Sequence, residues 1–81
     1  MKALTRYFIF DSITKRFFKE WDSNIPRFTE DFKSAKFYNN LGTGGPQKRK
    51  LQMYFNQMHL PIQLSLKSEN AYIRQLKLIG R

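Results

Sequence analysis

The chain has 81 residues, enough for one small domain (residues 1–81), and it contains no cysteine, which excludes disulfide bonds and thiolate–metal sites. Fifteen Lys and Arg residues against six Asp and Glu give a formal net charge of +9, which favours polyanions and acidic proteins as partners. The apolar runs are too short to span a bilayer, and charged residues interrupt any signal-peptide pattern, so we expect no membrane partner.

The first part of the chain predicts a β-hairpin. Residues 4–10 are rich in aromatic and β-branched residues, and residues 15–21 are rich in aromatic residues. The turn formers of residues 11–14 lie between these two segments. We therefore expect two antiparallel strands joined by a short turn.

The aromatic residues of this hairpin are candidates for the core and for the surface. Strict alternation in the second strand places Phe17 and Trp21 on one face and Phe18 on the other. Because so short a chain needs most of its aromatic side chains inside, we expect Phe17 and Phe18 in the core. For Tyr7 and Trp21, the sequence leaves burial and an exposed stacking role both open.

The segment after the hairpin predicts a loop and then a short helix. Pro26 argues against a central strand, so residues 22–28 are predicted to form a loop. Thr29 can cap a helix whose first turn holds two acids, where the helix dipole favours negative charge. This short helix is predicted to end at about Lys36, and residues 37–38 are predicted to be extended.

Residues 46–58 carry the clearest helical period. Pro46 suits the first position of a helix, because its missing N–H would have no partner there, and a glycine-rich turn over residues 42–45 precedes it. Pro61 ends the pattern. Four residues at positions i, i+3, i+4 and i+7 form a stripe that is expected to face the core: Leu51, Tyr54, Phe55 and Met58.

The last part of the chain predicts further strands. Residues 62–67 alternate between apolar and polar side chains, and residues 68–70 are predicted to form the turn that follows. Residues 71–79 favour another strand, with a bulge near Arg74. The alternative is a helix, whose apolar side would hold Tyr72, Leu76 and Ile79.

Taken in chain order, these elements predict an α+β fold. The N-terminal hairpin and the C-terminal strands are expected to form a small antiparallel sheet. The helix over residues 46–58 is expected to pack on one face of that sheet, because its apolar stripe must be buried.

The order of these features is similar to that of a known class of proteins. A hairpin precedes Trp21, a leucine–glycine turn leads into a helix, and between them runs Phe28-Thr29-Glu30-Asp31-Phe32-Lys33-Ser34-Ala35-Lys36-Phe37-Tyr38. Over roughly residues 5–58 this plan resembles small accessory proteins of bacteriophages. Such proteins often bind host enzymes or nucleic acid, so the resemblance implies a partner of that kind and a location in the cytoplasm of the host cell. It implies no functional residues.

The basic triplet Lys48-Arg49-Lys50 is the main candidate for a binding site. If the helix begins at Pro46, the triplet lies in the first turn, where cations oppose the helix dipole unless an anion is bound. Gly44 and Gly45 would then form an anion-binding turn with free backbone N–H groups. The segment does not match the nucleotide-binding pattern G-x-x-x-x-G-K-[ST], because two residues separate Gly45 from Lys48. A plain flexible connection is the alternative.

Other cations and aromatic residues are secondary candidates for the same partner. Interleaved bases and aromatic side chains can contact phosphates and stack on unpaired nucleobases. The secondary candidates are Lys15, Arg16, Arg74, Lys77, Tyr7 and Trp21.

The sequence favours neither catalysis nor a metal or cofactor. His59 is the single histidine and stands at a helix end, where a capping role is expected. Glu30 and Asp31 are adjacent and suit the start of a helix, so we do not expect them to divide acid and base roles.

These observations predict a small non-enzymatic protein that binds nucleic acid, or the machinery that handles it, through a basic face. The alternative is an inhibitor that binds an acidic surface of a host defence or metabolic enzyme.

Overall fold

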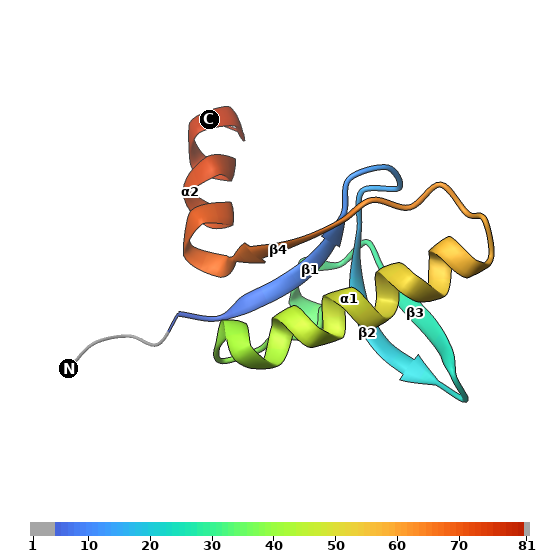
Figure 1. Ribbon diagram of the computed structural model, residues 1–81. Helices are drawn as coiled ribbons and strands as arrows, with labels where there is room; N and C mark the ends of the chain where they lie inside the picture. Colours follow the sequence, from blue (N-terminus) through green and yellow to red (C-terminus); the bar gives the residue numbers. More distant parts are fainter. Residues whose placement is uncertain (1–4, 81) are drawn as a thin grey trace.

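The computed structural model describes residues 5–80, with side chains described as far as Arg74. The elements along the chain are β1 (Tyr7–Asp11), β2 (Arg16–Asp22), β3 (Ile25–Thr29), a 3₁₀ turn η1 (Phe32–Ser34), α1 (Leu41–Gln57), β4 (Leu64–Ser68) and α2 (Glu69–Gly80). The strands form one antiparallel sheet in the order β3-β2-β1-β4. Figure 1 shows α1 lying along the sheet and α2 rising from the end of β4. The predicted α+β fold with one main helix is confirmed.

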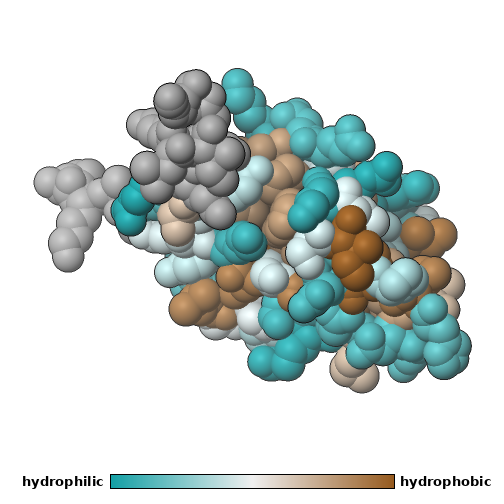
Figure 2. Space-filling view, turned by 90° about the horizontal axis from the view of Figure 1, so that it is seen from above, coloured by the Kyte–Doolittle hydropathy of each residue, from teal (hydrophilic) through white to brown (hydrophobic). Residues whose placement is uncertain are grey.

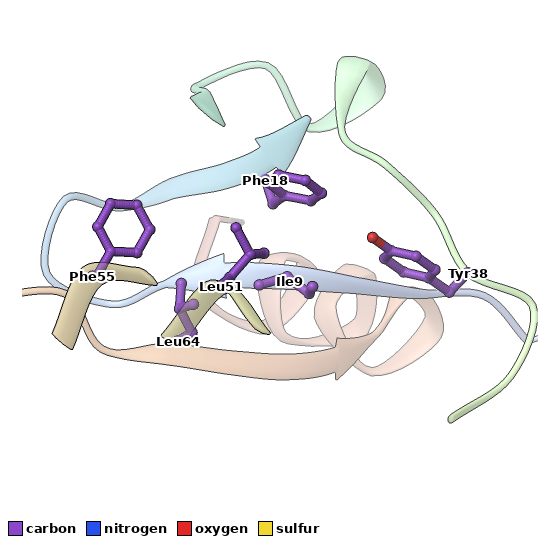
Figure 3. Packing of buried hydrophobic residues seen from close by; sticks show 6 residues of the cluster. All are labelled: Ile9, Phe18, Tyr38, Leu51, Phe55 and Leu64. Carbon is purple, nitrogen blue, oxygen red and sulfur yellow. The ribbon is translucent and has the colours of Figure 1, made fainter. Parts of the chain in front are cut away.

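One core lies between the sheet and α1. Alternation along β1 and β4 turns Ile9 and Leu64 toward the helix, and Leu51 projects back from α1 between them (Figure 3). The six buried residues of this cluster are Ile9, Phe18, Tyr38, Leu51, Phe55 and Leu64. Of the predicted helix stripe, Leu51 and Phe55 are buried, but Met58 is 52 % exposed because the helix ends before it can reach the sheet.

A second core lies on the opposite face of the sheet. Phe8 and Phe17 project there from β1 and β2, and Phe32 of η1 and Tyr72 of α2 cover them. The ring of Phe8 packs edge-on against Phe32 and Tyr72, with 5.1 Å between ring centroids in both pairs. Because Phe17 and Phe18 lie on opposite faces that are both covered, the expectation that both are buried is confirmed.

A β-bulge in β2 corrects the predicted position of Trp21. Phe18 pairs with Phe28 and Glu20 with Arg27, so β2 has one residue more than β3 between these two pairs. The extra residue shifts the alternation, and Trp21 therefore lies on the same face as Phe18 and packs against its ring at 6.1 Å. The prediction that Trp21 shares a face with Phe17 is wrong.

The predicted loop over residues 22–28 is also wrong, because Ile25–Thr29 forms β3. This strand is at the edge of the sheet, where Pro26 has no neighbour on its outer side to which it would have to donate a hydrogen bond. The predicted helix up to Lys36 is reduced to η1. Asp31 caps η1, rather than Thr29, and its carboxylate accepts a hydrogen bond from the backbone N–H of Lys33 at 3.1 Å.

The main helix begins five residues earlier than predicted. Asn40 is its cap, and the Asn40 side chain accepts a hydrogen bond from the backbone N–H of Thr43 at 2.8 Å. The glycine-rich segment 42–45 is therefore helical, and Pro46 lies inside the helix rather than at its first position.

The predicted strand over residues 71–79 is wrong, and the alternative helix is present as α2. Residues 68–70 do not form a separate turn, because Ser68 ends β4 and Glu69 and Asn70 begin α2. The Ser68 side chain accepts a hydrogen bond from the N–H of Ala71 at 3.2 Å, and Glu69 in the first turn pairs with Arg6 at 2.7 Å. Among residues 5–80, neither helix is long and apolar enough to cross a bilayer.

Candidate functional site

A hollow of the described surface lies between α1 and the tip of the β2–β3 hairpin. Its volume is about 680 Å³, within the usual range of about 300–1,000 Å³ for ligand sites. We call it the Trp21 groove. Its lining residues are Trp21, Asn24, Pro46, Arg49, Lys50, Met53, Tyr54 and Gln57.

The helix contributes one regular stripe to this groove. The six α1 residues in the lining follow the spacing i, i+3, i+4, i+7, i+8 and i+11, beginning at Pro46. This stripe lies next to the core-facing stripe that contains Leu51 and Phe55. A helix packed on the sheet by one stripe therefore presents the adjacent stripe to the hairpin tip.

Trp21 lines the groove from the side of the hairpin. Its half-buried indole packs edge-on against the Tyr54 ring, with 5.8 Å between centroids. The Lys50 ammonium lies 5.0 Å from the centroid of the indole ring, a cation–π contact. The indole nitrogen Nε1 is buried and has no hydrogen-bond acceptor among the residues that the structure describes.

The cations of the groove are not neutralised by acids. Neither Arg49 nor Lys50 has a carboxylate within 4.0 Å in the described part of the chain, and the lining residues named above include no acid. The arginines that do form ion pairs lie elsewhere: Arg6 with Glu69, Arg16 with Glu30 and Arg27 with Asp22. The groove therefore attracts anions.

The three residues of the basic triplet do not all lie on the same side of the helix. Arg49 and Lys50 line the groove, whereas Lys48 is half-buried and does not contribute to its lining. Because α1 begins at Leu41, the triplet lies beyond its first turn, and the prediction that its cations oppose the helix dipole is wrong.

Gly44 and Gly45 do not form an anion-binding turn, because both are helical. Gly44 is buried, and a Cβ atom built on it would lie 3.0 Å from Cδ1 of Leu66. Its small size is therefore explained by the close approach of α1 to β4.

The other predicted site residues whose side chains are described lie outside the groove. Lys15 is exposed in the β1–β2 turn, and Arg16 lines a second hollow of about 320 Å³. Tyr7 is half-buried, and its backbone exchanges two 2.8 Å hydrogen bonds with Tyr38. Arg74 is exposed on α2. The side chain of Lys77 is outside the described residues.

Sequence reasoning missed several groove residues, above all Tyr54, which was expected in the core. A signal for these residues was present in the sequence, because the α1 residues that line the groove follow the same helical spacing as the α1 residues that face the core. What could not be predicted was that Trp21 would lie opposite this stripe, since that depends on the bulge in β2.

Seen from the side of the β1–β2 turn, hydrophobic residues lie in patches between hydrophilic ones (Figure 2). The large hydrophobic side chains that are most exposed include Met53 and Leu41, at 59 % and 57 %. Met53 belongs to the Trp21 groove, so the groove combines apolar surface with positive charge.

No protein-family model, curated protein or solved structure matches this chain. The resemblance to small phage proteins stays a prediction.

Proposed function

We propose that this protein is a non-enzymatic nucleic-acid-binding protein and that the Trp21 groove is its binding site. The observation that supports the proposal is the position of Arg49 and Lys50, two cations without acidic partners, in the same groove as Trp21. Phosphate groups would supply the negatively charged partners that these cations lack.

The Lys50 side chain is suited to move from the indole to a phosphate. At an exposed site a cation–π contact contributes about 0.5–1 kcal/mol, whereas a hydrogen bond to a charged group contributes about 1.5–3 kcal/mol. Phosphate contacts of this kind give affinity that does not depend on base sequence. They also make binding weaken steeply as salt rises, because bound counterions are released.

The test is a fluorescence-anisotropy titration of labelled single- and double-stranded oligonucleotides at two salt concentrations. We expect binding at low salt that weakens strongly at high salt. In the double variant Arg49→Gln/Lys50→Gln, the slope of log affinity against log salt should fall by about 1.4 for a single strand, since each lost phosphate contact accounts for about 0.7.

A matched control is the double variant Lys33→Gln/Lys36→Gln, which removes the same charge from residues outside the groove. The proposal requires this control to retain most of the wild-type affinity. Equal losses in the two variants would mean that only net charge matters. No binding at low salt would refute the proposal, and an acidic protein surface would then be the partner to seek.

A further inference from the structure

The second hollow lies beside the Trp21 groove. Arg16 and Arg27 line it, together with Pro26 of β3 and the edge-to-face pair Phe28 and Phe55, whose ring centroids are 5.8 Å apart. Phe28 and Phe55 belong to the core between the sheet and α1, so both hollows open on the helix side of the sheet.

Only one layer of side chains separates the two hollows. Trp21 lines the groove, and Pro26, its partner across the strand pair, lines the second hollow. On the helix, Tyr54 lines the groove and Phe55 lines the second hollow, and their rings are in contact at 5.2 Å. The two hollows are therefore neighbours, and a long, thin ligand would cross the ridge formed by these side chains to occupy both.

The charges along this path are positive overall. The groove has Arg49 and Lys50, and the second hollow adds Arg16. Arg27 also lines the second hollow, but its pairing with Glu20 places its side chain on the other face of the sheet, where it pairs with Asp22. Arg16 pairs with Glu30 at the surface at 3.8 Å, and such an exposed pair is weak, so a phosphate can replace the carboxylate.

We propose that the Trp21 groove and the second hollow form one continuous binding path for single-stranded nucleic acid, with an unpaired base stacked on Trp21. This inference rests on the proposed function. A single strand is required because the faces of bases in a duplex are covered by their neighbours, whereas unpaired bases stack on aromatic side chains. Lys50, which lies over the indole ring, would leave that position as a base enters.

The test compares labelled thymidine oligonucleotides of about 4 and about 12 nucleotides, lengths within the range of known single-strand sites. We expect the long oligonucleotide to bind on the order of tenfold more tightly, because it also reaches the second hollow. The variant Arg16→Gln should remove this advantage and weaken binding of the short oligonucleotide far less than binding of the long one.

Trp21 is the single tryptophan of the chain, so its fluorescence reports directly on the groove. Both oligonucleotides should quench its emission, and a duplex of the same length should not. The variant Trp21→Leu should weaken binding of both lengths. The control variant Lys33→Gln/Lys36→Gln should retain the preference for the longer strand.

The outcomes separate this inference from the proposed function. If oligonucleotides bind and Arg49→Gln/Lys50→Gln weakens them, but length has no effect or a duplex binds equally well, the continuous path is refuted and the proposed function stands. If no oligonucleotide of any length binds at low salt, both are refuted.

Discussion

Asp11 shows how a single charged residue can hold several segments together. Its side chain is fully buried at the end of β1. The carboxylate accepts hydrogen bonds from the backbone N–H groups of Ile13 and Thr14 in the β1–β2 turn and from that of Gln63, just before β4. Burial raises the pKa of Asp11, but hydrogen bonds from Thr14, Gln63 and Ile13 outweigh it, so the pKa lies below its ordinary value of 3.8.

We expect Asp11→Asn to lower the free energy of unfolding by about 1–3 kcal/mol at neutral pH, because a buried hydrogen-bonded charge is lost. A group whose pKa is lower in the folded state stabilises the fold above its unfolded pKa. That stabilisation is lost as pH falls from about 4 through the folded value. The difference between wild type and variant should therefore shrink over this range in urea-denaturation curves.

Asp31→Asn is the matched control for this experiment. The Asp31 carboxylate also has a lowered pKa, first through its hydrogen bond from Ser34, but it is exposed and holds only η1. Its loss should destabilise the protein less than the loss of Asp11. An equal effect of the two substitutions would contradict the role given to Asp11.

At the scale of elements, the start of α1 is the least stable part of the helix. Three glycines and one proline lie among its first six residues. Pro46 cannot donate to the carbonyl of Gly42, and the glycines favour the unfolded chain. The Asn40 cap and the contact of Gly44 with Leu66 hold this segment in the helix nevertheless.

Pro46→Ala should therefore raise the free energy of unfolding by roughly 1–2 kcal/mol. The restored helical hydrogen bond outweighs the greater entropy of the unfolded chain. Urea denaturation followed by circular dichroism measures this change. A loss of stability would mean instead that the helix begins at Pro46, where proline is favourable.

Gly44→Ala is the companion variant. Helix propensity alone would predict a gain of about 1 kcal/mol. The new Cβ would lie 3.0 Å and 3.3 Å from the two methyl carbons of Leu66, however, so β4 or the Leu66 side chain must shift. We expect the variant to be no more stable than wild type, and a full gain would show that α1 and β4 are not in close contact there.

The sequence predicted elements correctly where one strong pattern decided the structure. The hairpin of β1 and β2, the apolar stripe around Leu51 and the alternation in residues 62–67 are of this kind. Prediction from the sequence failed where tertiary packing decided the structure. The position of β3 at the edge of the sheet allowed Pro26 in a strand. The Asn40 cap extended α1 through the glycines. The contact of Tyr72 with Phe8 made residues 69–80 a helix that covers the second core.

The candidate site was predicted only in part for the same reason. Arg49 and Lys50 were the main candidates for binding a partner and Trp21 was a secondary one, and the structure brings these three together. Their association depends on the register between β2 and β3, which local sequence does not encode. The role of Gly44 and Gly45 followed from a helix start that was misplaced by five residues.

For the molecule as a whole, the net charge of +9 opposes compactness. At about 0.01 M ionic strength the Debye length is about 30 Å, comparable with the longest dimension of the molecule, 40 Å, so charges repel across the whole structure. At about 0.15 M ionic strength the Debye length is only about 8 Å.

Raising sodium chloride over this range should therefore raise the melting temperature, by roughly 4 °C for each 1 kcal/mol of repulsion removed. Differential scanning calorimetry measures the shift. The variant Lys33→Gln/Lys36→Gln, with a net charge reduced by two, should show a smaller one. A melting temperature that falls with salt would indicate that attractive ion pairs such as that of Arg6 and Glu69 outweigh the repulsion.

The extra residue in β2 has a consequence for how this protein can change in evolution. Gain of one codon between positions 27 and 28 would give β3 the residue that it lacks opposite the bulge. Every lining residue of the groove would remain in the gene, yet strict alternation would return and turn the indole of Trp21 to the other side of the sheet. A gapped alignment would score such a descendant as having kept its binding residues. The length of β2 relative to β3 is therefore as informative about binding as the identity of the residues.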